Sequence, residues 1–125
     1  MPLQISTLTI LAGQSLSNGV NCSKGRCVLI EFPDQWNAAN MTFQVSSDGV
    51  TWRDYFYITP GTFMPMEVRE VMMPVLAKVA TIVTGPQWAD VLWIKIRSGT
   101  TARPIVQSAD RKFVLTIDMA AAVIS

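Results

Sequence analysis

The sequence contains no histidine, and this absence removes several kinds of catalytic chemistry. Histidine is the commonest general base, the partner of serine and cysteine nucleophiles and the usual nitrogen ligand of zinc. Two carboxylates could still serve a glycosidase, but the nine acidic residues are scattered along the chain. Glu67 and Glu70, for example, flank Arg69 in a stretch that we expect to be solvated. The phosphate-binding patterns GxGxxG and GxxxxGK[ST] do not occur. We therefore expect no enzymatic activity, no metal and no cofactor.

Charge is also sparse. Only 15% of the residues are charged, against about 25% in an ordinary soluble domain. The net charge is +1, and no block of like charges occurs, so we expect no binding to nucleic acid. Half of the residues are apolar, and a chain of this size has a high ratio of surface to volume. We therefore expect partners to cover part of its surface.

Long hydrophobic runs are missing too. No run approaches the roughly 18 to 20 apolar residues that a bilayer requires, because prolines and charged residues interrupt the most apolar region, residues 63–84. The first residues lack the basic segment of a secretory signal. We predict a soluble protein that is made in the cytoplasm and does not enter a membrane. Cys22 and Cys27 could form a disulfide in an oxidising compartment, but the missing signal favours free thiols.

The chain instead contains short runs of alternating apolar and polar residues, rich in β-branched and aromatic types and separated by Gly, Pro, Asn and Ser. Such runs are typical of half-buried strands. Several of them at near-regular spacing predict one all-β domain over residues 1–125, an antiparallel β-sandwich that resembles a jelly roll. The expected strands are residues 3–10, 27–32, 41–46, 51–58, 91–97 and 112–119.

The alternation also predicts which side chains point into the core. In the last strand the inward residues are Phe113, Leu115, Ile117 and Met119. In residues 91–97 the inward residues are Leu92, Ile94 and Ile96, and the outward residues are Trp93, Lys95 and Arg97.

An Asp-Gly pair at positions 48 and 49 lies between two of the expected strands. This dipeptide favours a two-residue hairpin turn in which both residues have positive φ. We therefore interpret Asp48 as a turn residue without a chemical role. Such a turn would place the side chains of residues 41, 43, 45, 52 and 56 on one face of the hairpin. The pairs that it predicts are Val45 with Trp52 and Met41 with Phe56.

Two segments are less regular. Residues 33–40 could form a short helical turn, which Asp34 would cap. Residues 68–85 fit a helical period in part, but Pro74 interrupts that period and β-branched residues dominate the second half. We favour strands there, with a broken helix as the alternative.

Aromatic and methionine side chains are the best candidates for contacts with other molecules. Four tryptophans, together with Tyr55 and Tyr57, could form a platform for a sugar, although core packing or a subunit contact is the simpler interpretation. Trp93 should lie outside the core, and the flexible thioethers of residues 64–73 suit an adaptable protein contact. The candidate interface or ligand-facing residues are Trp93, Trp88, Met64, Met66, Met72 and Met73.

Two segments carry a family resemblance, PDQWNAANMTFQVSSDGVTWRDYF (residues 33–56) and WIKIRSGTTARPIVQSADRKFVLTI (residues 93–117). They resemble a type of small β-sandwich protein found in the virions of tailed bacteriophages. The resemblance implies a structural role without a cofactor, as a capsid decoration (cement) protein, a head-fibre base or a tail accessory component. Residues 63–83 match no pattern of this type.

From this resemblance and the composition we expect a capsid decoration protein on the virion surface. It would associate with itself, as a homotrimer by analogy with the family, and bind the major capsid protein. The alternatives are a carbohydrate-binding or host-adhesion module and a tail or baseplate subunit. A decoration protein should bury Trp93 and residues 64–73 between chains, whereas an adhesion module should line an open cleft with two or more aromatic rings.

Overall fold

The computed structural model describes residues 3–59, 67–83 and 91–119, and these residues form strands joined by turns and loops. The strands follow the runs of alternating residues, because a strand with one buried face needs an apolar residue at every second position. In chain order the strands are β1 (Leu3–Ile10), β2 (Val20–Asn21), β3 (Arg26–Glu31), β4 (Met41–Ser46), β5 (Arg53–Asp54), β6 (Phe56–Thr59), β7 (Glu67–Glu70), β8 (Ala80–Ile82), β9 (Trp93–Ser98) and β10 (Arg111–Asp118).

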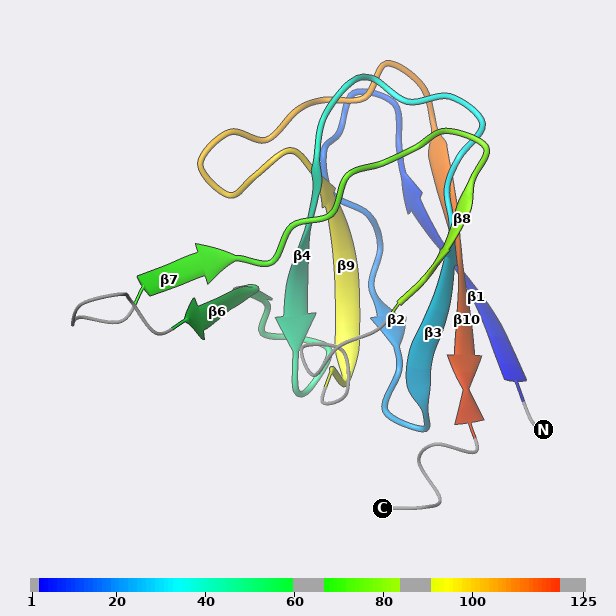
Figure 1. The fold of residues 1–125 in the computed structure, drawn as a ribbon, viewed down its shortest axis with the longest axis vertical. Coiled ribbons are helices and arrows are strands. Elements are labelled where there is room, and N and C mark those ends of the chain that lie inside the picture. Colours follow the sequence, from blue (N-terminus) through cyan, green and yellow to red (C-terminus); the bar gives the residue numbers. More distant parts are fainter. Residues whose placement is uncertain (1–2, 60–66, 84–90, 120–125) are drawn as a thin grey trace.

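The strands form two four-stranded sheets and one separate ribbon (Figure 1). One sheet has the order β1-β10-β3-β8 and the other the order β2-β9-β4-β5, and every pairing is antiparallel. The ribbon consists of β6 and β7 and projects from the side of the second sheet. The predicted fold class, an all-β antiparallel sandwich, is confirmed.

The core lies between the two four-stranded sheets. The inward face of β10 is confirmed, since Phe113, Leu115 and Ile117 are buried and Met119 packs against the core. The Phe113 ring makes edge-to-face contacts with Phe32 and with Trp36, at 6.2 and 5.4 Å between centroids. Each such buried side chain stabilises the fold by about 1.5–3 kcal/mol relative to an exposed one. The apolar residues that share this core include Leu8, Ile10, Ile30, Met41, Phe43, Ile94 and Ile96.

The hairpin at the Asp-Gly pair differs from the prediction by one residue, because Val45 pairs with Arg53 and not with Trp52. The Asp48 carboxylate accepts hydrogen bonds from the N–H groups of Val50 and Thr51, at 2.8 Å each. These bonds stabilise a turn that is one residue longer than the predicted one. Positive φ is confirmed for Gly49, at 78°, and is wrong for Asp48.

The second predicted pair of this hairpin is wrong as well. Met41 pairs with Ser98 of β9 on one side and with Met73 on the other. Phe56 belongs to the ribbon, where it pairs with Glu70. The chain therefore leaves the second sheet after β5.

The predicted helical turn at residues 33–40 is wrong, since the structure shows no helix there. Contacts with distant residues hold this segment instead. The Asn37 N–H, for example, donates to Gln107 Oε1 at 2.9 Å. The Trp36 indole donates to the carbonyl of Ala39 at 3.0 Å. The preference for strands over a helix in residues 68–85 is confirmed where the structure describes them, by β7 and β8.

Candidate functional site

The β6–β7 ribbon joins the sandwich along the part of the β4 edge that β5 does not cover. The Tyr55 N–H donates to the carbonyl of Phe43 at 3.0 Å. Met73 and Met41 exchange two backbone hydrogen bonds, of 2.7 and 2.9 Å. Between these two attachments the ladder of the ribbon continues, since the Val71 N–H donates to the carbonyl of Tyr55 at 3.0 Å. The base of the ribbon is therefore fixed to β4 at two points.

The two faces of the ribbon differ in character. Directly opposite residues share a face, and Tyr57 lies opposite Arg69 while Ile58 lies opposite Val68. One face, the tyrosine face, carries Tyr55, Tyr57, Arg69 and Val71. The other face carries Phe56, Ile58, Val68 and Glu70, and all but Glu70 are exposed.

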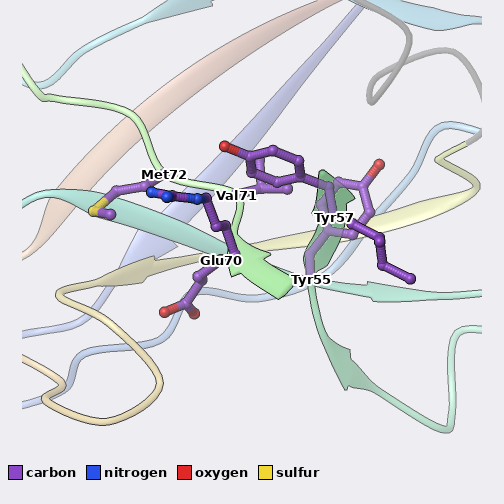
Figure 2. Close-up of a pocket in the computed structure, with 7 residues that line it drawn as sticks. Tyr55, Tyr57, Glu70, Val71 and Met72 are labelled. Carbon is purple, nitrogen blue, oxygen red and sulfur yellow. The ribbon is translucent and has the colours of Figure 1, made fainter. Parts of the chain in front are cut away.

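A hollow of about 910 Å³ lies along the tyrosine face (Figure 2). Val71 is buried at this hollow, Tyr55 is half-buried, and Tyr57 and Met72 are exposed. Figure 2 shows the Glu70 side chain pointing away from the two tyrosine rings. The residues that line the hollow are Tyr55, Tyr57, Ile58, Arg69, Glu70, Val71 and Met72.

A buried ion network ties the ribbon to the second sheet. The Arg97 guanidinium donates hydrogen bonds to Asp54 and, at 3.3 Å, to Glu70. Thr101 donates to Glu70 through its hydroxyl at 2.6 Å and accepts from Arg97 at 2.9 Å. The hydrogen bond from Arg97 lowers the pKa of Asp54, and burial raises it by less. The pKa of Asp54 is therefore below its usual value.

The prediction that Glu70 is solvated is therefore wrong. Arg97 does lie on the outward face of β9, as the alternation predicts, but the ribbon and the loop at residues 99–104 cover it. Glu67 is solvated as predicted, and it accepts a 2.6 Å hydrogen bond from the exposed Arg69. The sequence alone does not reveal which outward residues a projecting ribbon will cover.

Trp93 lies in a second aromatic cluster on the outward face of the same sheet. Its ring packs edge-to-face against Trp52, with 6.5 Å between centroids. The Lys95 ammonium lies 4.5 Å from the centroid of the Trp52 ring, a favourable cation–π distance. These contacts leave Trp93 half-buried. The inward position predicted for Leu92 is wrong, since this residue precedes β9 and is exposed.

The remaining candidates from the sequence lie in different places. Met72 lines the hollow, whereas Met73 packs against the core. Trp88, Met64 and Met66 lie outside the described residues. The sequence indicated Tyr55 and Tyr57 as parts of a candidate sugar platform, but it did not predict that Arg69 and Val71 line a hollow with them. The available signal was the run of aromatic residues at positions 55–57, which departs from strict alternation.

The outer face of the β1-β10-β3-β8 sheet carries an uncharged row of residues. Ile5 lies opposite Thr116, Thr116 opposite Leu29, and Leu29 opposite Ile82, so the row crosses all four strands. Its two ends are the most open, at 62% exposure for Ile5 and 72% for Ile82. Strand β1 forms one edge of this sheet and contains no charged residue.

Burial and local hydrogen bonds also shift the pKa values of the two cysteines and of Asp48. Burial raises the pKa of Cys22 to about 11 and that of Cys27 to about 12, so both free thiols stay protonated near neutral pH. Hydrogen bonds from the Thr51 and Val50 N–H groups and from Ser46 lower the pKa of Asp48 to about 2. In the described part of the chain, no three His, Cys, Asp or Glu side chains gather as metal ligands. That part also contains no helix of the length and apolarity needed to span a membrane.

Comparison of the chain with protein families, with curated proteins and with solved structures found no match.

Proposed function

We propose that the chain is a non-enzymatic structural protein of a tailed-phage virion. In this role it decorates the outside of the capsid, associates with copies of itself and binds the major capsid protein. It stabilises the head by covering apolar surface on neighbouring subunits, with no chemical step. The resemblance of residues 33–56 and 93–117 to small virion sandwiches supports this role, and the proposed trimer depends on that resemblance alone.

The observation that carries the proposal is the uncharged row Ile5–Thr116–Leu29–Ile82 on the outer sheet face. The face of an antiparallel sheet that points to solvent usually carries polar residues. Exposed apolar patches mark contacts with other molecules. The adjoining edge strand β1 lacks the charges and prolines that commonly protect such an edge from pairing, and the Asn18 side chain covers it only at the Thr9 N–H and the Thr7 carbonyl. A neighbouring protein that packs on this face would remove both features from water.

The number of copies per virion tests the proposal. Quantitative mass spectrometry of purified particles should give a number close to that of the major capsid protein, or a fixed simple fraction of it. A handful of copies would favour a tail or baseplate subunit, and absence from the particle would contradict a virion role. Sedimentation of the purified chain should show self-association, and a monomer at every concentration would contradict that part of the proposal.

Substitutions on the outer face test the surface itself. Ile5→Glu and Ile82→Glu should each weaken binding to capsids that lack the protein, because a charge buried at a contact is costly. Val50→Glu is the matched control, since Val50 is also exposed but lies in the turn at residues 47–52. Equal binding by all three variants would contradict the assignment of this face.

A further inference from the structure

The hollow on the tyrosine face has no part in the contacts proposed above, and its two aromatic rings are the feature expected of an adhesion module. Its volume, about 910 Å³, lies within the roughly 300–1,000 Å³ of typical small-ligand sites. Tyr55 and Val71, at the base of the ribbon, line the hollow and are joined by a backbone hydrogen bond. Tyr55 also donates a hydrogen bond to Phe43 of β4, so the base of the hollow is attached to the second sheet.

The lining favours a ligand that is apolar on one side and polar on the other. Tyr55 and Tyr57 present aromatic rings that end in hydroxyl groups, and aromatic faces pack well against C–H groups. The hollow remains open to solvent, since Tyr57 and Met72 are exposed. An entirely apolar ligand would leave much of its own surface in water there. A pyranose ring, which has a C–H face and a rim of hydroxyls, matches this environment.

The charges favour a neutral ligand. Glu67 accepts hydrogen bonds from Nε and Nη2 of Arg69, at 3.1 and 2.6 Å, and so balances its charge. The remaining nitrogen, Nη1, carries two further N–H groups that can donate to hydroxyl oxygens. Glu70 points away from the rings and is bound to Arg97 and Thr101. With a net charge of +1 on the whole chain, neither a phosphorylated ligand nor a nucleic acid is favoured.

We propose that this hollow binds a neutral saccharide, which packs against Tyr55 and Tyr57 and accepts hydrogen bonds from Arg69. The sugar lies along the ribbon, with the buried Val71 beneath it. Saccharide binding goes beyond the virion role and does not depend on it, because the hollow is formed within one chain. Each copy of a virion protein with this site would bind a glycan weakly, and many copies together would raise the overall avidity.

Nuclear magnetic resonance of the ¹⁵N-labelled full chain provides the test. The probes are maltotriose, cellotriose and N,N′-diacetylchitobiose, with glycerol as a control that supplies hydroxyls without a ring. At least one saccharide should shift the amide signals of residues 55–58 and 69–72 with a dissociation constant in the millimolar range, while glycerol should not. Shifts with none of the three saccharides, or shifts confined to other parts of the chain, would overturn the proposal.

Two adjacent residues of β6 supply a matched pair of variants. Tyr57 is 43% exposed on the tyrosine face and Phe56 is 41% exposed on the opposite face. Tyr57→Ala should weaken saccharide binding by about tenfold, as expected for loss of one aromatic contact, whereas Phe56→Ala should change it by less than about twofold. Equal losses in the two variants would show that the ribbon as a whole, and not this hollow, is responsible. Presence or absence of the protein in virions has no bearing on this result, so the two proposals can fail separately.

Discussion

Replacement of Arg97 by methionine tests how strongly the buried ion network stabilises the fold. The Arg97 side chain is 8% exposed, and methionine would leave the Glu70 carboxylate, 10% exposed, without its cation. Loss of one partner from a buried ion pair costs about 3–5 kcal/mol. Asp54 is 35% exposed and can regain water, so we expect a cost near the lower limit, about 3 kcal/mol. Urea unfolding followed by tryptophan fluorescence measures this difference.

Arg69→Met is the matched control for this experiment. Arg69 also binds a glutamate of β7, but its side chain is 61% exposed, and exposed ion pairs contribute about 0–1 kcal/mol. The double variant Arg97→Met, Glu70→Met should regain part of the stability lost in Arg97→Met, because it no longer buries an unpaired carboxylate. If Arg97→Met costs no more than Arg69→Met, the network does not support the fold and the reasoning is wrong.

Three further changes test other features of the fold by urea unfolding. Gly99→Ala should cost clearly more than Gly13→Ala: both residues have positive φ, 89° and 82°, but a Cβ at Gly99 would overlap backbone atoms while one at Gly13 meets nothing within 4 Å; equal midpoints would contradict this. The hydrogen bond from the buried guanidinium lowers the pKa of Asp54 below about 3.9, so its stabilisation is complete above that pH and is lost as the pH falls through the folded pKa. Asp54→Asn should therefore be less stable at neutral pH but lose less stability between about pH 5 and pH 3, and an unchanged acid dependence would refute the assignment. Burial raises the pKa of Cys22 and Cys27 to about 11 and 12, whereas unfolded thiols titrate near about 8.5. The stabilisation from the protonated thiols is therefore complete below that pH, and the free energy of unfolding falls above it. Cys27→Ala should flatten this decline between about pH 9 and pH 11, and a slope equal to that of the wild type would contradict the argument.

The sandwich and the inward face of β10 could be predicted because alternation is a local property of the chain. Phe113, Leu115 and Ile117 repeat at every second position, and that period places them on one face whatever surrounds the strand. The same reasoning gave the correct face for Arg97. It did not predict that Arg97 is buried, because part of the cover comes from Glu70, which is 27 residues away in the chain.

The hairpin register and the hollow could not be predicted for a different reason. The Ser46 hydroxyl and the Asp48 carboxylate accept hydrogen bonds from the N–H groups of Gly49 and Val50 and so stabilise a turn with one extra residue. Propensity rules for the dipeptide do not include such bonds. That extra residue moves Trp52 to the outer face, where it meets Trp93. The hollow depends on departure of the ribbon from the sheet after Asp54, and no residue pattern marks this change of direction.

The buried network links the two proposals physically. A two-stranded ribbon is only marginally stable by itself, so the tyrosine face keeps its shape through the attachments at its base, of which the contact between Glu70 and Arg97 is one. Arg97→Met should therefore weaken saccharide binding although Arg97 does not line the hollow. Ile5→Glu lies on the other sheet and should weaken only the capsid contact. If Arg97→Met left saccharide binding unchanged, the ribbon would be held by its backbone bonds to β4 alone.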